Sequence, residues 1–318
     1  MSASARPAAA DVSAARVTDP AVGVVGAGRV GAVLAAALTA AGHRITAVSG
    51  AGPASRDRIR RLLPGVQPWP VAEVADAAEL LILAVPDDVL PTVVADLVAA
   101  GVLRPGQVVA HTSGAHGLAV LAPAAVVGAA PLALHPAMTF TGERGDLDRL
   151  PGISYGVTAD RPLRPLATRL VAALGGTVEW VAEMDRPLYH AALAHGANHL
   201  VTLVNEASDR LRDAGVADPG RVLAPLLRAA LDNALAHGDA ALTGPVSRGD
   251  AGTVARHLDR LADTAAESLP GYLALARRTA DRAIAAGRLP AAAAVPLLDV
   301  LAGREPVATS GRRREPVR

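Results

Sequence analysis

The stretch Gly23–Gly31, with the sequence GVVGAGRVG, decides the fold class of this chain. Three of its four glycines, Gly26, Gly28 and Gly31, have G-x-G-x-x-G spacing. They lie between an apolar run (residues 22–25) that predicts a strand and an Ala/Leu-rich segment that predicts a helix ending at Gly42. In that context the first glycine permits a tight turn, the second lets a pyrophosphate approach the backbone, and the third lets helix and strand pack closely. The helix N-terminus adds free N–H donors. We therefore expect a dinucleotide at Gly26, Ala27, Gly28, Arg29, Val30 and Gly31.

Because Ala/Gly-rich chains also generate this spacing by chance, a loop that merely turns the chain is the alternative. The end of the second predicted strand, residues 45–48, indicates which dinucleotide is bound. Folds that prefer NAD usually place an acidic residue there to hold the ribose hydroxyls. Here Ser49 follows the strand and Arg56 comes soon after, a hydroxyl and a guanidinium that suit a 2′-phosphate. We predict NADP as the cofactor, and the competing interpretation is an Arg56 that only faces solvent.

Further apolar runs predict a mostly parallel sheet, because helical segments separate most of them. The predicted strands are residues 80–85, 107–111, 132–135, 153–157 and 178–181. After Asp185 only helical periodicity continues, broken at proline-containing turns, up to about residue 301. The expected fold is α/β, and its predicted parts are a Rossmann-type domain (residues 21–184), an all-helical domain (185–302) and disordered ends (1–20 and 303–318).

The composition excludes several classes of protein. The chain has 318 residues, of which 31 are basic, all of them arginine, and 30 are acidic. Because the net charge is only +1, we expect no nucleic-acid-binding face. Hydrophobic residues make up 51%, which excludes a disordered chain. The absence of cysteine and lysine excludes disulfides, thiolate metal sites and Schiff-base chemistry.

One uncharged stretch, residues 117–134, is long enough to be considered as a membrane span. Pro123, Gly128 and Pro131 interrupt it, so we expect a buried helix followed by a buried strand, and no membrane insertion. The first twenty residues lack the apolar core of a signal peptide, and we expect a cytoplasmic protein.

The helical segment after Asp185 carries a polar stripe on an otherwise apolar helix. At about 100° per residue, one arc of roughly 120° collects His195, Asn198, His199, Thr202, Asn205 and Glu206. These side chains suit hydrogen bonding to a substrate, and histidine transfers protons near neutral pH. A helix–helix or dimer contact is the alternative. A metal site is disfavoured because no carboxylate follows the two histidines at a standard spacing.

Polar residues also follow two predicted strands, where ligands bind in open α/β sheets. His111 and Ser113 follow one strand, and His135 follows another, so we expect Ser113 and His135 near the substrate. Arg248 follows a Gly-Pro turn and is a candidate clamp for a substrate carboxylate. For each, a structural or solvent-facing role is the alternative.

The motifs in chain order resemble a known bacterial family. They are GVVGAGRVG, LAVPDD (83–88), HTSG (111–114), LHPAMTF (134–140), YHAA (189–192) with Asn198, and LTGPVSRGD (242–250). The family joins a Rossmann-like domain to a helical domain of unknown function, numbered 2520. It is similar in plan to ketopantoate reductase, pyrroline-5-carboxylate reductase and the 6-phosphogluconate dehydrogenase group.

The resemblance implies an NADP-dependent oxidoreductase with Val85, Pro86 and Asp87 at the cofactor, a 6-phosphogluconate dehydrogenase-like helical domain, and an active site between the domains. Ketopantoate reductase and its relatives place a catalytic lysine four residues before the asparagine, where this chain has Ala194 and no lysine anywhere. His190 lies within the family pattern and His195 outside it, and both remain candidate proton donors.

The leading hypothesis is reduction of a small carbonyl, such as the 2-keto acid ketopantoate, by NADPH. Asn198 is expected to hydrogen-bond the substrate oxygen, His195 or His190 to deliver the proton, and Asn205 to bind substrate. Two alternatives are a dinucleotide-binding sensor or assembly protein without turnover, and a cyclic imine reductase. We expect a homodimer formed through the helical domain.

Overall fold

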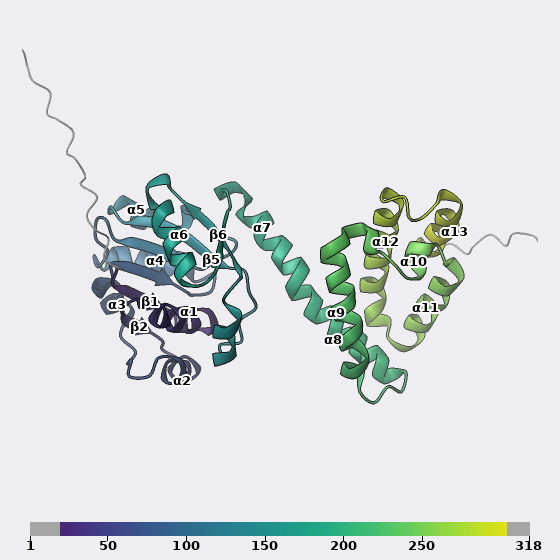
Figure 1. Ribbon diagram of the computed structural model, residues 1–318, viewed down its shortest axis with the longest axis horizontal. Helices are drawn as coiled ribbons and strands as arrows, with labels where there is room; N and C mark the ends of the chain where they lie inside the picture. The colour runs from purple at the N-terminus through teal and green to yellow at the C-terminus, as the bar shows by residue number, and fades with distance from the viewer. Residues whose placement is uncertain (1–19, 304–318) are drawn as a thin grey trace, which may run out of the picture. The chain divides into compact units, whose positions relative to one another are not determined.

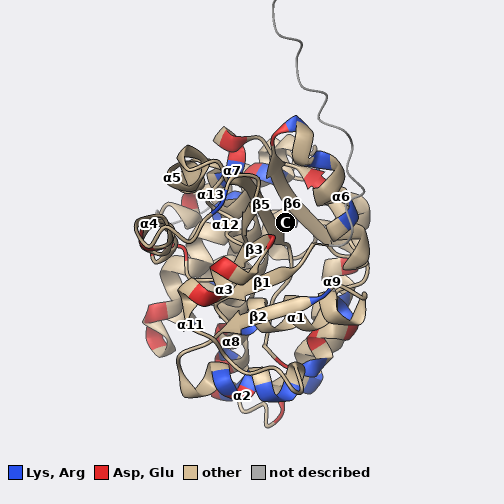
Figure 2. Ribbon diagram, turned by 90° about the vertical axis from the view of Figure 1, so that its left-hand side faces the viewer, with Lys and Arg blue, Asp and Glu red and all other residues tan. Residues whose placement is uncertain are grey.

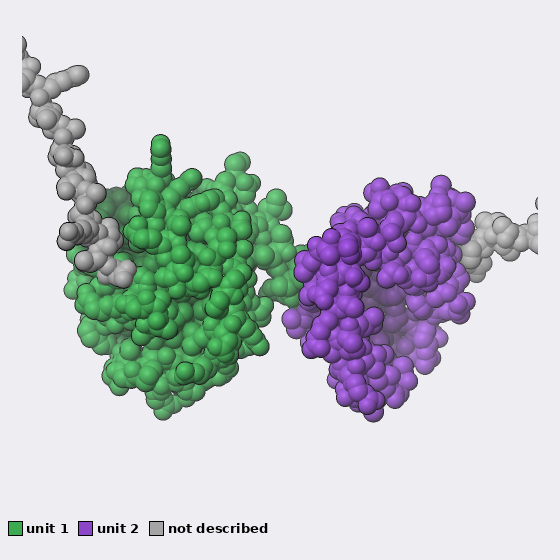
Figure 3. Space-filling view, viewed as in Figure 1, with its two compact units in different colours: residues 1–198 green, residues 199–318 purple. Residues whose placement is uncertain are grey.

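The computed structural model describes residues 20–303 and divides into two compact units, residues 1–198 and 199–318 (Figure 3). The helical run that begins at Arg186 crosses this division, whereas the sequence placed a domain boundary at the start of that run. The predicted disordered ends lie outside the described residues, apart from one residue at each end.

Unit 1 contains a seven-stranded sheet in the order β2-β1-β3-β4-β5-β6-β7 (Figure 1). Its strands are β1 (Val22–Val25), β2 (Ile45–Ser49), β3 (Leu80–Leu83), β4 (Val108–His111), β5 (Ala130–Pro136), β6 (Ser154–Ala159) and β7 (Thr177–Trp180). Strands β1 to β5 run parallel, β6 is antiparallel to β5, and β7 is parallel to β6. Because β2 and β3 flank β1, the strand order reverses at β1, and ligands bind beside such a switch point.

Helices cover both faces of the sheet, and residues along β3 alternate between two cores. Leu80 and Ile82 pack with α1 (Arg29–Ala40) and α6 (Arg164–Ala173). Leu81 and Leu83 pack with α3 (Val71–Ala77) and α4 (Leu90–Ala99). A parallel strand buried on both faces needs such an uninterrupted apolar run. The helices of unit 1 are α1 (Arg29–Ala40), α2 (Pro53–Leu62), α3 (Val71–Ala77), α4 (Leu90–Ala99), α5 (Ala122–Val126), α6 (Arg164–Ala173) and α7 (Arg186–Leu193). The predicted Rossmann-type fold is confirmed.

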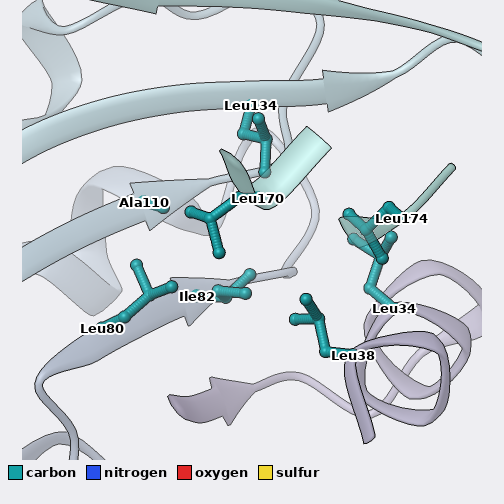
Figure 4. A pocket seen from close by; sticks show the side chains of 8 residues that line it. All are labelled: Leu34, Leu38, Leu80, Ile82, Ala110, Leu134, Leu170 and Leu174. Carbon is teal, nitrogen blue, oxygen red and sulfur yellow. The ribbon is translucent and has the colours of Figure 1, made fainter. Parts of the chain in front are cut away.

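One cavity of about 10 Å³ lies inside the core between α1, the sheet and α6 (Figure 4). Its lining is entirely apolar, and consists of Leu34, Leu38, Leu80, Ile82, Ala110, Leu134, Leu170 and Leu174. A space of this size holds at most one water, and a water needs polar partners that this lining does not offer. The cavity is therefore a packing gap in the core.

Residues 117–134 contain a helix followed by a largely buried strand, β5, as predicted, but the prediction that the helix is buried was wrong. The chain instead forms a 3₁₀ turn, η1 (Ala119–Leu121), and the five-residue α5, in which Val126 is 86% exposed. Pro123 lies in the first turn of α5, and Gly128, at φ +91°, ends the segment. A proline at a helix start and a positive-φ glycine just beyond its end leave room for only a short helix.

Unit 2 is helical, as predicted, and consists of α8 (His199–Asp213), α9 (Pro219–His237), α10 (Pro245–Arg248), α11 (Ala251–Thr264), α12 (Leu269–Ala285) and α13 (Ala291–Leu301). The predicted breaks coincide with helix starts; Asp218, for example, caps α9 by accepting the N–H of Arg221. A separate core joins α10 to α13 around Val254, Ala280 and Leu297. Within residues 20–303, no helix is long and apolar enough to cross a membrane.

Candidate dinucleotide and substrate site

The three glycines of the G-x-G-x-x-G motif, two in the loop between β1 and α1 and Gly31 in the first turn of α1, have different surroundings. Gly26 has φ +95°, and a Cβ there would lie 2.6 Å from the Ala84 carbonyl oxygen. A Cβ on Gly31 would lie 2.2 Å from the Gly26 carbonyl oxygen, so close packing of α1 excludes any side chain. A Cβ on Gly28 would meet no atom closer than 4.0 Å. The fold itself thus requires Gly26 and Gly31, whereas Gly28 leaves open space beside the backbone.

The N-terminus of α1 borders this space. Its first turn contains no acidic residue, and its N-cap residue, Gly28, has no side chain that could cap the helix. The first intrahelical bond runs from the Ala32 N–H to the Gly28 carbonyl at 3.2 Å. The N–H groups of Arg29, Val30 and Gly31 have no acceptor in the part of the chain that the structure describes, and they suit the negative charge of a pyrophosphate. These residues fit a dinucleotide.

Ser49, at the end of β2, holds the glycine loop in place. Its side chain is buried, and its Oγ accepts the Gly26 N–H at 3.1 Å while its carbonyl accepts the Ala27 N–H at 2.8 Å. The hydroxyl proton of Ser49 is still available to a ligand oxygen. The helix that follows begins with Pro53 at its first position, which suits the fixed φ of proline.

Basic residues gather on α2 (Figure 2), and they fall into two groups. Arg60 and Arg61 pair with Asp57, and Arg61 also pairs with Glu143. Arg56 and Arg58, by contrast, have no carboxylate partner among residues 20–303. Arg56 and Arg60 both line a hollow of about 340 Å³ between α2 and the segment 66–68.

The loop after β5 brings two of the arginines together. A Cβ on Gly142 would lie 2.8 Å from the Arg58 Nε and 2.9 Å from the Arg29 Cγ, so both side chains contact this loop. The fully buried Asp146 fixes the loop: its carboxylate accepts the N–H groups of Thr141 and Gly142 at 2.8 Å and the Thr141 hydroxyl at 3.0 Å. Arg29 also lacks a carboxylate partner in the described chain, so this loop is contacted by two arginines whose charges no carboxylate of the described chain pairs with.

His111 at the end of β4 is a structural residue. Its Nδ1 accepts the Ser113 N–H at 3.2 Å, which leaves Nε2 to donate to the Gly117 carbonyl at 2.8 Å. Burial lowers the pKa of His111 to about 4, so the ring is neutral. The predicted substrate residue Ser113 is buried in the same turn, where its Oγ accepts the N–H groups of Ala115 and His116.

A second set of aromatic and imidazole rings lies at the end of β5. The Nδ1 of His135 and the Tyr189 hydroxyl are 2.9 Å apart, and the two rings meet edge to face. The ring centroids of His135 and His190 are 6.0 Å apart. A Cβ on Gly114 would lie 2.6 Å from the His190 Cδ2 and 3.0 Å from the His135 Nε2, so this glycine admits both rings. The HTSG, LHPAMTF and YHAA motifs therefore converge on one cluster.

Arg186, the first residue of α7, lies fully buried beneath this cluster. Its Nη1 donates to the Gly156 carbonyl at 3.2 Å, while its Nε and Nη2 have no acceptor among the described residues. The Arg186 Cζ lies 6.0 Å from the centre of the Tyr189 ring. Burial lowers the pKa of His135 to about 4, and the positive charge of Arg186 acts in the same direction.

The predicted polar stripe is not one continuous helical face. Ala194–Asn198 form a π-helical turn, η5, between α7 and α8. Hydrogen bonds from residue i to i+5 change the angle per residue, so the assumed 100° fails there. His195 and Asn198 lie exposed in η5, and Asn205 lies exposed in α8 of unit 2. Arg248 forms an ion pair with Asp250 at 2.9 Å.

The sequence interpretation missed Tyr189, Arg186 and the glycine beneath the tyrosine ring, Gly156. Tyr189 had a signal in the YHAA motif, but its partner His135 is far away along the chain. Arg186 had none, because an arginine at a helix start usually faces solvent.

Comparison with known proteins assigns both halves of the sequence. Residues 4–136 match a model of the Rossmann-like domain, and residues 153–279 match the domain of unknown function DUF2520. The chain is a Rossmann-like protein with a DUF2520 domain. The resemblance inferred from the motifs is thereby confirmed. No curated protein matches the DUF2520 protein described here.

Several solved structures share the fold of this DUF2520 protein. One is a Bacteroides fragilis protein whose name proposes an NADP oxidoreductase, with 22% identity and a TM-score of 0.72. Others are pyrroline-5-carboxylate reductase from Streptococcus pyogenes, with 17% identity and a TM-score of 0.56, and pyrroline carboxylate reductase from Plasmodium falciparum with NADP bound, with 10% and 0.53. Each match covers 83% of this chain and 98% of the other. The fold is thus one that nicotinamide-dependent oxidoreductases use.

Proposed function

We propose that this protein is an NADP-dependent reductase of a small carbonyl compound. One juxtaposition carries the proposal. The open Gly28 cradle follows β1, and the imidazoles of His135 and His190 meet at the end of β5, on the same edge of the sheet. Cofactor and substrate bind at that edge in open α/β folds.

The proposed chemistry divides between cofactor and chain. NADPH, when bound, supplies the hydride that reduces the carbonyl carbon. His190, or His195 in its place, gives a proton to the substrate oxygen, and Asn198 hydrogen-bonds that oxygen. Ser113 and His135 border the substrate. Asn205 and Arg248 are the remaining candidates to bind it, and Arg248 would have to exchange Asp250 for a substrate carboxylate.

The preference for NADP over NAD rests on Ser49 and on the arginines without carboxylate partners. A 2′-phosphate brings two negative charges, and guanidinium groups bind phosphate through paired hydrogen bonds. Val85, Pro86 and Asp87, which follow β3 next to the glycine loop, complete the proposed cofactor site. A 2-keto acid such as ketopantoate is the proposed substrate.

The helical domain is proposed to form a homodimer. Helix α8 buries none of its residues and α9 buries only Pro219 and Leu223. Leu226 and Leu235 on α9 are 61% and 79% exposed, and such surfaces commonly pair between subunits. Replacing both leucines with glutamate should give a monomer in light scattering with unchanged helix content. A monomeric wild-type protein would contradict the proposal.

Calorimetric titration with NADPH and, separately, NADH tests the cofactor, and NADPH oxidation with 2-keto acids and cyclic imines then tests the reaction. We expect micromolar binding of NADPH and much weaker binding of NADH. Binding of neither would mean that the glycine loop is architectural. Unchanged turnover in a folded Asn198→Ala variant would remove Asn198 from the mechanism.

A further inference from the structure

Two neighbouring histidines, His111 and His135, differ in how their nitrogens are satisfied. Both are neutral at pH 7, since burial lowers the pKa of each to about 4. Both nitrogens of His111 bond to the backbone of its own loop. The Nδ1 of His135 bonds to Tyr189, whereas its Nε2 has no partner within residues 20–303. A polar atom that the chain leaves unsatisfied beside the candidate substrate site is available to a ligand.

Tyr189 determines which nitrogen of His135 carries the proton. Burial raises the pKa of the Tyr189 phenol, so the hydroxyl keeps its hydrogen at neutral pH. The positive charge of Arg186 and the Gly156 backbone act in the opposite direction. A phenol O–H is more acidic than an imidazole N–H, and an imidazole nitrogen is a stronger base than a phenol oxygen, so the Tyr189 hydroxyl donates to the His135 Nδ1. The hydrogen of neutral His135 then lies on Nε2.

The charges around His135 come from several elements. Arg186 and His190 on α7 and His111 on β4 disfavour its protonation, and Asp87 after β3 favours it. Arg186 is the one of these groups that is buried and permanently charged, and two of its nitrogens lack acceptors in the described chain. The net field at His135 is therefore positive. Such a field stabilises negative charge that develops on a substrate.

We propose that His135 is a catalytic hydrogen-bond donor whose Nε2–H binds the substrate carbonyl oxygen, and that Tyr189 is the positioning residue that fixes this tautomer. The proposal rests on the proposed reductase function. In a chain without lysine, a neutral imidazole held in one tautomer provides the polarising group. His190 or His195 remains the proton donor.

This arrangement favours carbonyl substrates over cyclic imines. A carbonyl oxygen gains negative charge during reduction, and both the Nε2–H and the Arg186 charge stabilise it. A protonated cyclic imine has no lone pair to accept the Nε2–H, and its positive charge is repelled by Arg186. We therefore expect reduction of 2-keto acids and not of cyclic iminium compounds.

The tautomer can be measured without any enzymatic activity, by NMR of the full-length protein labelled with ¹⁵N-histidine. We expect His135 to show the Nε2–H pattern and no titration between pH 5.5 and 8, and the Tyr189→Phe variant to show a mixture of tautomers. The matched control is Tyr272→Phe, because the Tyr272 hydroxyl lies 2.9 Å from the Nδ1 of an exposed histidine, His257, in unit 2. This control should leave the His135 signals unchanged. A His135 that titrates near pH 6.5, or carries its proton on Nδ1, overturns the proposal.

Kinetics test the role of the donor. His135→Ala should lower kcat for a carbonyl substrate about 100-fold, the usual loss for one oxyanion donor, with the KM for NADPH within about threefold. His135→Gln, which can place an amide N–H near the position of Nε2, should restore at least tenfold of that loss. Tyr189→Phe should lower kcat and Tyr272→Phe should not. An unchanged kcat in a folded His135→Ala variant overturns the donor role, as does a wild-type enzyme that reduces only cyclic imines. Because the NMR experiment needs no turnover, it shows whether the predicted His135 tautomer is wrong or whether only the proposed reductase function is wrong.

Discussion

The Tyr189 ring occupies the space that a side chain on Gly156 would need. A Cβ built on Gly156 would lie 2.5 Å from the Tyr189 hydroxyl oxygen, and Gly156 is also the cross-strand partner of His135. One glycine thus brings the phenol within hydrogen-bonding distance of the imidazole on the adjacent strand. The cluster depends on this close approach.

Gly156→Ala should therefore displace Tyr189 and destabilise the protein. Overpacking a filled site costs about 1–3 kcal/mol, which urea denaturation measures as a lower midpoint. Gly145→Ala is the control, since a Cβ there meets no atom within 4 Å. Equal midpoints for the two variants would show that Tyr189 moves aside without cost.

Substitutions in the glycine loop should separate folding from cofactor binding. Gly28→Ala should leave the melting temperature close to that of the wild type, because its Cβ enters open space, while NADPH affinity falls at least about tenfold. Gly31→Ala should lower stability by several kcal/mol, since its Cβ would overlap the Gly26 carbonyl. Thermal unfolding and calorimetry measure the two effects. A Gly28→Ala variant with wild-type affinity would contradict the proposed cofactor site.

The arginines of α2 should contribute unequally to cofactor choice. Arg56→Ala should weaken NADPH binding about tenfold or more and leave NADH binding unchanged, because charge-assisted hydrogen bonds contribute about 1.5–3 kcal/mol. Arg60→Ala is the matched control on the same helix, since Arg60 lines the same hollow as Arg56 but already pairs with Asp57. Equal losses for NADPH and NADH would assign Arg56 to a role other than binding the 2′-phosphate.

Stability should fall as the pH is lowered below about 6.5. His111 is neutral in the fold, with a pKa of about 4, but has an ordinary pKa of 6.5 when unfolded. The unfolded state therefore binds more protons between these values, so the contribution is complete above pH 6.5 and is lost towards pH 4. The slope from this residue is at most about 1.4 kcal/mol per pH unit. Urea denaturation at several pH values should show a shallower slope for a folded His111→Gln variant.

The sequence predicted the features that depend on residues close together in the chain, and it did not predict those that depend on contacts between distant segments. The glycine loop, the strand Leu80–Leu83 and the proline-marked helix starts depend on neighbouring residues, and the structure has them near the expected positions. The cluster of His135, Tyr189 and Arg186 depends on contacts between segments about 50 residues apart. Taken one at a time, His135, Tyr189 and Arg186 are residue types that occur at strand ends and helix starts without any shared function, so the sequence did not indicate that they meet.

The π-helical turn could not be predicted from the sequence either. Its apolar and polar residues are those of an α-helix, and only the hydrogen-bond register differs. The assumed rotation of about 100° per residue does not hold across Ala194–Asn198 for that reason. The residues predicted to bind substrate from unit 2, Asn205 and Arg248, stay predictions.

The two matched sequence families meet between residues 136 and 153, yet the sheet continues across that junction. His135 belongs to one family, and Gly156 and Tyr189 belong to the other. Exchange of either segment between distant relatives would separate the imidazole from its phenol and from the glycine that admits it. Positions 135, 156 and 189 should therefore be inherited together. Covariation among these three positions would identify the site in relatives, where the glycine loop alone does not indicate the reaction.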